Sequence, residues 1–233
     1  MDFAAGRMFH TFSIIGRCAR TERLGIAITT GDIAVGSRCP YVTPGVGAIS
    51  TQAATDPRLG PFALRLLKLG YSASRVMQEL ESSDPHIELR QLGLVDRNGN
   101  SAARTGKRNA EWAGHIAREN FVAMGNRLAG EQVVKAMAAA FAQSNAEYLG
   151  ERLLRVVEAG QEAGGEAPHG AKYHSAALLV CGSQGFPDVD LRVDDHPTPI
   201  VELRRVFDAY APDIDFFTLR PNDPNVAIAR RGT

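Results

Sequence analysis

Two short segments near the start of the chain are filled with apolar and small residues and carry almost no charge. These segments, Thr11–Cys18 and Leu24–Thr30, have the composition of strands that are covered on both faces. The turn between them predicts a β-hairpin whose first strand begins on a threonine. Further strands are expected at Val46–Gln52, Phe121–Gly125, Ser175–Cys181 and Asp190–Val193.

A second hairpin is marked by Asn98-Gly99, because both residues tolerate the positive φ angles that a tight turn requires. Its strands are predicted at Gln91–Asp96 and Ser101–Thr105. Helices with start or stop signals occupy other parts of the chain. They are expected from Pro61 to Gly70, over Ala73–Ser82 after the cap Ser72, over Glu131–Gln143 and Glu147–Ala163, and over Ile200–Tyr210 after Thr198-Pro199.

Three stretches show no regular pattern: a loop with Pro40 and Pro44, a loop with Trp112 and His115, and the tail after Pro212. The helices fall in blocks rather than alternating with single strands. This order favours an α+β domain in which two sheets lie between helix layers. No linker or internal repeat divides the chain, so we expect a single domain over residues 11–233, preceded by a leader of residues 1–10.

Composition narrows the classes of function. Lys+Arg and Asp+Glu number 26 each, so the net charge is zero and the clustered basic excess of a nucleic-acid-binding protein is missing. No apolar run approaches the length of a membrane span, and the leader lacks the apolar region of a secretory signal. The cysteines, Cys18, Cys39 and Cys181, are odd in number without close pairing, which predicts reduced thiols in a cytoplasmic protein.

Thr11 is the candidate nucleophile, because it stands at the head of the first strand. If it becomes the N-terminal residue, its α-amine can serve as base for its own hydroxyl, and one residue supplies both groups. The simpler interpretation is that a β-branched residue favours a strand. The leader decides between the two, since Thr11 has no free amine while residues 1–10 precede it.

A series of short motifs runs from Thr11 to about Tyr210. They are Thr11–Ile14, Leu24–Ala27, Ala34–Ser37, Gly45–Ala48, Thr51–Ala53, Gly60-Pro61, Gln91–Asp96, Trp112–His115, Gly125-Asn126, Leu128–Gly130, Glu158–Gln161, Gly164-Gly165, Ser175–Val180 and Asp190–His196. Together they resemble the domain-of-unknown-function family numbered 1028, whose members are assigned an Ntn-hydrolase-like (N-terminal-nucleophile hydrolase) fold. The resemblance implies a four-layer αββα sandwich with Thr11 at the nucleophile position. It leaves the substrate open, because a fold does not fix a function.

The leader departs from that family, whose members commonly begin Met-Thr-Phe-Ser, so that loss of Met exposes the threonine. Three explanations are open: the start is misassigned, processing is required, or the mechanism does not operate here. The fold implied by the resemblance places Ser37, Thr51 and Gln52 opposite the nucleophile, where backbone N–H groups or the Gln52 amide would stabilise an oxyanion. Taken singly, Ser37 is also an ordinary turn residue and Thr51 an ordinary strand residue.

Other polar residues are weaker candidates for the same pocket. Asn126, followed by Arg127, either binds a substrate carbonyl or carboxylate or ends its strand in a left-handed turn. His115 is either an acid–base group near neutral pH or a packed loop residue.

Asp190, Arg192 and Asp194 share one face of a predicted strand. One interpretation is an ion-pair network that orients the site or forms a dimer contact. The other, which we favour, is structural: the acidic residues stand before the N-terminus of the next helix, where negative charge is stabilising. The histidines show no spacing typical of metal ligands, so neither metal nor cofactor is expected.

Three functions fit these observations. The first is a hydrolase that cleaves a small amide through Thr11. The second is a non-catalytic relative that binds a small metabolite, favoured by the leader and by the lack of a lysine beside the first strands. The third is a scaffold acting through an oligomer surface, suggested by Phe216, Phe217 and Leu219 in the tail. We expect a homo-oligomer with a small-molecule ligand and with no nucleic-acid or membrane partner.

Overall fold

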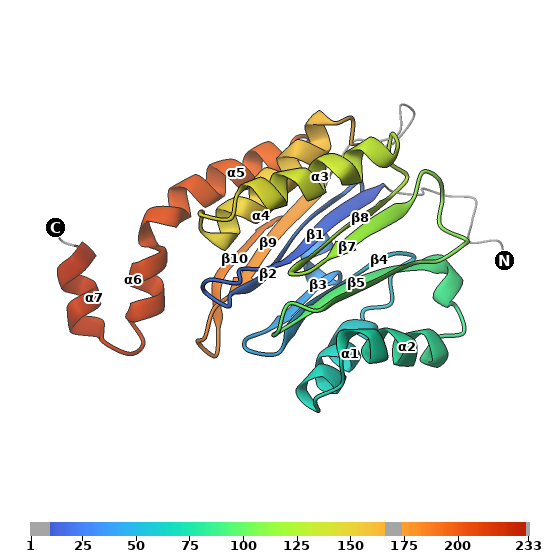
Figure 1. Cartoon of the computed structure of the whole chain (residues 1–233). Helices are drawn as coiled ribbons and strands as arrows, with labels where there is room; N and C mark the ends of the chain where they lie inside the picture. Colours follow the sequence, from blue (N-terminus) through green and yellow to red (C-terminus); the bar gives the residue numbers. More distant parts are fainter. Residues whose placement is uncertain (1–9, 166–173, 232–233) are drawn as a thin grey trace.

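The computed structural model describes residues 10–165 and 174–231, so residues 1–9 of the predicted leader lie outside it (Figure 1). Two antiparallel sheets face each other, and helices cover their outer faces. The larger sheet has the order β10-β9-β2-β1-β8-β7. Its strands are β1 (Thr11–Arg17), β2 (Leu24–Thr30), β7 (Gly114–Arg118), β8 (Phe121–Asn126), β9 (Ser175–Cys181) and β10 (Pro187–Val193).

The smaller sheet has the order β3-β4-β5-β6. Its close approach to the larger sheet requires a residue without a side chain on β5. A Cβ placed on Gly93 would lie 2.9 Å from Val122 Cγ1 of β8. The strands are β3 (Pro40–Thr43), β4 (Gly47–Ala53), β5 (Arg90–Asp96) and β6 (Ser101–Thr105).

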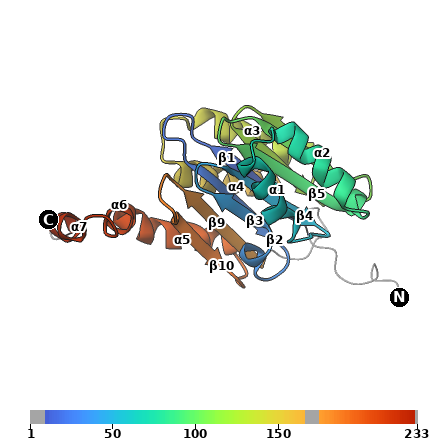
Figure 2. The same cartoon turned by 90° about the horizontal axis from the view of Figure 1, so that it is seen from below.

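Seven helices lie in the described part of the chain, and five of them cover the sheets. On the larger sheet these are α3 (Glu131–Gln143), α4 (Leu149–Glu162) and α5 (Pro199–Tyr210) (Figure 1). On the smaller sheet they are α1 (Leu59–Lys68) and α2 (Ala73–Ser83), which Figure 2 shows from below. As predicted, Ser72 caps α2, its hydroxyl accepting a hydrogen bond from Arg75 N–H at 3.3 Å. Thr198 precedes α5, but its side chain makes no capping bond.

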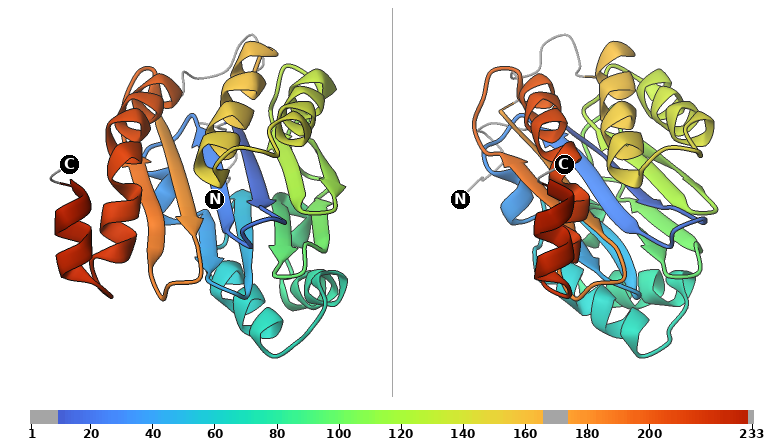
Figure 3. Two further views of the ribbon diagram at one scale, coloured as in Figure 1. Left: turned by 60° about the vertical axis from the view of Figure 1, so that its left-hand side comes forward. Right: turned by 90° about the vertical axis from the view of Figure 1, so that its left-hand side faces the viewer.

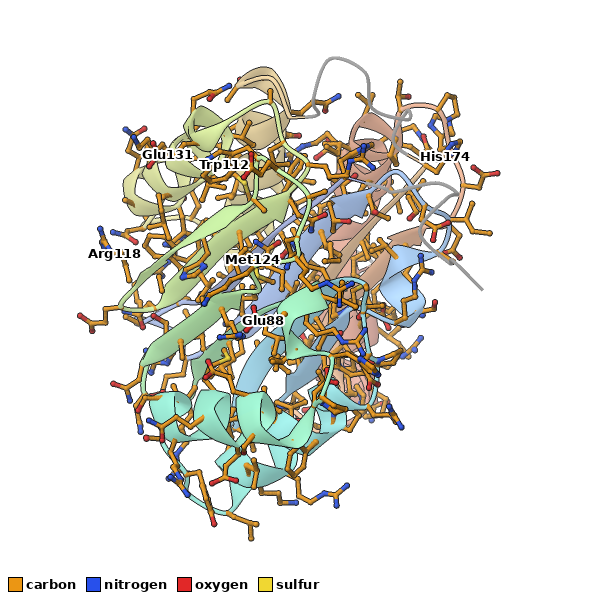
Figure 4. The ribbon with its side chains drawn as sticks, turned by 90° about the vertical axis from the view of Figure 1, so that its right-hand side faces the viewer. Glu88, Trp112, Arg118, Met124, Glu131 and His174 are labelled. Carbon is orange, nitrogen blue, oxygen red and sulfur yellow. The ribbon has the colours of Figure 1, made fainter. Side chains whose placement is uncertain are left out.

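Strand β1 is buried along its whole length, because each of its faces packs against a different layer. Phe12 and Ile14 join the core beneath α3 and α4. Ile15 joins the core between the sheets, together with Met124 of β8, which is labelled in Figure 4. Since side chains alternate along a strand, Thr11 and Ser13 share the inter-sheet side with Ile15. The predicted burial of this hairpin on both faces is confirmed.

Three expectations about irregular segments are wrong. The segment Pro40–Thr43 is β3, and it tolerates a proline because it is an edge strand. The segment around His115 is not a loop but β7, an edge strand of the larger sheet that is only partly buried. The tail forms two short helices, α6 (Ile214–Leu219) and α7 (Pro224–Arg231), which extend beyond β10 (Figure 3). Stacking of Tyr210 on Phe217, with ring centroids 5.2 Å apart, fixes α6 to the end of α5.

The mixed α+β class with two sheets is as predicted. Within the described ranges, no helix is both long enough and apolar enough to cross a membrane.

Candidate functional site

A pocket of about 300 Å³ opens where β1 begins and β2 and β8 end. Register places Thr30 of β2 and Asn126 of β8 on either side of Thr11, so these three residues meet at one end of the sheet. His174 marks this end in Figure 4, because its N–H donates to the carbonyl oxygen of Thr30 at 2.9 Å. All three strand-end residues line the pocket, together with Gln52 from the end of β4. The pocket therefore lies between the ends of both sheets.

Thr11 is 6% exposed, and its hydroxyl lies 2.8 Å from the hydroxyl of Thr30. The Thr30 hydroxyl donates to the carbonyl oxygen of His10 at 2.9 Å, which also accepts the Gly31 N–H at 3.1 Å. Because Thr30 has one hydroxyl proton and has already donated it, the proton between the two hydroxyls belongs to Thr11. Within the described residues, Thr11 Oγ1 hydrogen-bonds to no ionisable side chain.

A buried network of amide side chains lies behind Thr11. Gln52 Oε1 accepts from the Ser13 hydroxyl at 2.7 Å, while Gln52 Nε2 donates to Gln91 Oε1 at 2.7 Å and to the Thr11 carbonyl oxygen at 3.4 Å. Both amide protons of Gln52 are thus committed. Within residues 10–165 and 174–231, Asn126 Nδ2 makes one bond, to Gln91 Oε1 at 3.1 Å, so its second N–H is not used by these residues. Asn126 is therefore a better side-chain donor for an oxyanion than Gln52.

Three predicted pocket residues do not line the pocket. The Ser37 hydroxyl donates to the Ala34 carbonyl oxygen at 2.7 Å within its own turn. Thr51 is fully buried and its hydroxyl pairs with that of Thr55 at 2.6 Å. His115 contacts the network only indirectly.

The indirect contact of His115 runs through Thr105. His115 Nδ1 lies 2.9 Å from the Thr105 hydroxyl, which also accepts from Gln91 Nε2 at 2.9 Å. Burial lowers the pKa of His115. His115 thus lies outside the pocket lining and reaches Gln91 through the Thr105 hydroxyl.

The predicted charge network of Asp190, Arg192 and Asp194 is on the edge strand β10 and its end, outside the pocket lining. Arg192 pairs with Asp190 at 3.0 Å, and both side chains are exposed. The Asp194 carbonyl oxygen accepts the Ala34 N–H at 2.8 Å. The Arg192 stem packs near Gly36, where a Cβ would lie 3.0 Å from Arg192 Cδ. The contacts of Asp194 and Arg192 hold the turn between β2 and β3.

Ionisable groups around Thr11 are tuned by burial. Burial, followed by the charges of Arg127 and His174, lowers the pKa of His10 to about 4. Burial raises the pKa of Cys39, which lines the pocket, to about 12. The thiol is therefore protonated at neutral pH and is not a competing nucleophile. All three cysteines are buried and free, as predicted.

The sequence matches a family model described as "Family of unknown function (DUF1028)" over residues 11–203, a match that starts at Thr11. The chain belongs to the DUF1028 family. A crystal structure of another DUF1028 protein, SPO2555 from Silicibacter pomeroyi, is similar to it. The two are 31% identical with a TM-score of 0.79, over 86% of this chain and 89% of that one.

Anbu, the ancestral beta-subunit from Yersinia bercovieri, matches 87% of this DUF1028 chain and 96% of its own length. It is 11% identical with a TM-score of 0.40, a likeness too weak to define the fold. None of the functionally curated proteins matches the sequence.

Sequence reasoning missed two residues that line the pocket of this DUF1028 chain, Thr30 and Arg108, and one residue of the network behind it, Gln91. Thr30 could have been found from the register of the first hairpin, because pairing residues outward from the turn sets Thr30 opposite Thr11. Gln91 is the second residue of β5, where it follows Arg90 and precedes the apolar residues of the strand. Arg108 lines the pocket from the segment between β6 and β7, and no local pattern indicates that placement.

Proposed function

We propose that this chain is an amide hydrolase of the Ntn type, with an αββα sandwich fold and with the hydroxyl of Thr11 as nucleophile. The observation that carries the proposal is the position of Thr11. Thr11 is the first residue of the central strand β1 and lines the pocket. Its hydroxyl donates a hydrogen bond to the hydroxyl of Thr30 on the neighbouring strand. The family match that starts at this residue supports the same assignment.

The chemistry requires cleavage of the peptide bond between His10 and Thr11, because the base is the α-amine that this cleavage exposes. Thr11 Oγ1 then attacks the substrate carbonyl carbon, and its proton passes to the α-amine. The C–N bond of the tetrahedral intermediate breaks as the protonated amine gives that proton to the leaving nitrogen. Water, deprotonated by the same amine, attacks the Thr11 ester and releases the carboxylate product. No further co-reactant is needed.

Stabilisation of the oxyanion is assigned to Asn126. Its uncommitted amide N–H lies on the strand next to Thr11, and Gln91 fixes the orientation of the amide. Removal of a single oxyanion donor costs about 10²–10³ in kcat in enzymes of this general type. An Asn126→Leu variant that hydrolyses amide as fast as the unchanged protein would rule out this role.

The first test is intact-mass spectrometry of protein purified from its native host, together with ammonia release from a panel of small amides. The active form should begin at Thr11. Thr11→Val keeps the shape of the side chain but lacks the hydroxyl, so it should be inactive. Thr11→Ser should keep part of the activity, and Thr43→Ala, on the edge strand β3, should keep all of it. Activity in protein that retains residue 10, or in Thr11→Val, contradicts the proposal.

A second candidate is binding of a small metabolite without turnover. It is favoured by the hydrogen bonds that Thr30 and Gly31 make to the His10 carbonyl, which continue the hairpin past Thr11. In that form the Thr11 nitrogen is an amide and cannot act as a base. A ligand that raises the melting temperature of the wild type and of Thr11→Val alike, and is never consumed, would support this alternative.

A cytoplasmic location and a homo-oligomeric state are further proposals. The extension of α6 and α7 beyond the sheet supports the second (Figure 3). Light scattering on the full chain and on a chain ending after α5 tests whether these helices hold copies together.

A further inference from the structure

The charged residues of the pocket are mostly arginines. Arg38, Arg108 and Arg127 line it, and Asp32 is the one acidic residue of the lining. Asp32 pairs with Arg38 at 2.9 Å. Arg38 also donates to the carbonyl oxygens of Ile33 at 2.7 Å and Ala34 at 3.0 Å. Asp32 and Arg38 thus form one ion pair within the lining, and the other two charged residues that line the pocket, Arg108 and Arg127, are both basic.

Arg108 and Arg127 come from two different loops whose backbones are joined. The Arg127 N–H donates to the Ala110 carbonyl oxygen at 3.1 Å, and the Arg108 N–H donates to the Glu88 carbonyl oxygen at 2.9 Å. Arg127 directly follows Asn126, the residue that pairs with Thr11 across the sheet. Main-chain hydrogen bonds thus hold together the two loops that carry these arginines, and both residues line the pocket.

The acidic residue closest to Arg108 in these contacts, Glu88, has its carboxylate occupied elsewhere. Glu88 Oε1 accepts from Arg104 at 2.6 Å and Oε2 from the Lys107 N–H at 2.8 Å (Glu88 is labelled in Figure 4). Arg108 is exposed, and its guanidinium makes no hydrogen bond or ion pair with any residue in the described ranges. The charge of Arg127 acts on His10: after burial, it is the next largest cause of the lowered pKa of His10.

We infer that the pocket binds a small amide that also carries a carboxylate, with the carboxylate on Arg108 and Arg127 and the amide carbonyl at Thr11. Guanidinium groups bind carboxylates through paired, charge-assisted hydrogen bonds. The lining also includes the apolar residues Val35 and Leu89, which suit a short aliphatic chain. The volume of about 300 Å³ is at the small end for ligand pockets. The substrate class is thus the monoamide of a short dicarboxylic acid. This inference rests on the proposed function for the placement of the amide.

The test measures binding separately from turnover. Isothermal titration of full-length Thr11→Val would compare succinamate and glutaramate with their uncharged diamides, succinamide and glutaramide. At least one acid should bind about tenfold or more tightly than its diamide, the effect of one charge-assisted interaction. Arg108→Gln and Arg127→Gln should each remove most of that preference. Arg97→Gln, at the exposed tip of the β5–β6 hairpin and outside the pocket, should leave it unchanged.

The outcomes separate the two proposals. Equal affinity for acid and diamide, or no binding of either, refutes the carboxylate inference and leaves amide hydrolysis by Thr11 to its own test. Binding of the acid that depends on the arginines, with no hydrolysis by wild type beginning at Thr11, supports the inference and contradicts the hydrolase. Arg108 is exposed, so Arg108→Gln is expected to fold. Its circular dichroism and melting temperature provide the check, and an unchanged preference in folded Arg108→Gln overturns the assignment.

Discussion

Replacement of Gln91 by leucine removes the centre of the amide network behind Thr11. Gln91 is fully buried; its Oε1 accepts from Gln52 at 2.7 Å and Asn126 at 3.1 Å, and its Nε2 donates to the Gly125 carbonyl oxygen at 2.8 Å. Leucine is similar in size but leaves these three buried groups without that partner. Since each unsatisfied buried group costs about 1–3 kcal/mol, the free energy of unfolding should fall by roughly 3–9 kcal/mol. That is a large share of the roughly 5–15 kcal/mol typical of a domain.

Urea unfolding followed by circular dichroism measures this loss. The midpoint should shift to lower urea with the slope m unchanged, which indicates lower stability rather than a change in the unfolded ensemble. Gln143→Leu, at the exposed end of α3, is the matched control and should change the free energy by no more than about 0.5 kcal/mol. A loss of less than about 1 kcal/mol in Gln91→Leu would refute the reasoning, because the network would then contribute little to the fold.

Three further predictions concern packing, pH and thiol reactivity. Gly60→Ala places a Cβ that would overlap the ring of Tyr41, so stability should fall by about 1–3 kcal/mol in the same assay, and an unchanged midpoint would contradict it. The pKa of His10 is lowered to about 4 in the folded state, chiefly by burial, so the unfolded chain binds more protons below its ordinary pKa of 6.5. The free energy of unfolding should therefore fall as the pH drops from about 6.5 to 4, and this fall should be smaller in His10→Phe; identical pH profiles would exclude the effect. Cys39, whose pKa burial raises to about 12, should resist iodoacetamide at pH 8 until the protein is unfolded, which peptide mass mapping would detect; rapid labelling of native protein would show that the thiol is accessible.

The central strands are predictable from sequence because complete burial leaves a simple pattern. β1 and β2 are apolar on both faces, since helices cover one side and a second sheet covers the other. The edge strands β3 and β7 lack such a pattern. β3 starts on a proline, and β7 alternates only weakly between partly buried and exposed residues. Their strand character comes from pairing with a neighbour, which local sequence does not record.

The candidate site is predictable only in part, for a related reason. Thr51 and Gln52 are adjacent on a strand, so their side chains point to opposite faces and only one of them can meet the pocket. Pairing of β4 with β5 sets Gln52 opposite Gln91 and turns Thr51 away. Arg108 depends on the path of a loop between two edge strands. The register of a single hairpin can thus be predicted from the sequence, whereas contacts between sheets and loops can be known only from the tertiary structure.

Thr30 connects the register of the first hairpin to the proposed chemistry. While residue 10 is attached, the hydroxyl proton of Thr30 is donated to the His10 carbonyl, so Thr30 can only accept the proton of Thr11. The proposed cleavage removes the carbonyl acceptor and frees the Thr30 proton to be donated to Thr11 Oγ1. The Thr11 proton can then turn toward the new α-amine. One broken bond would supply the base and also reverse the hydrogen bond between the two hydroxyls. The β1–β2 ladder begins at the Thr11–Thr30 pair, so this change leaves the pairing of the two strands intact.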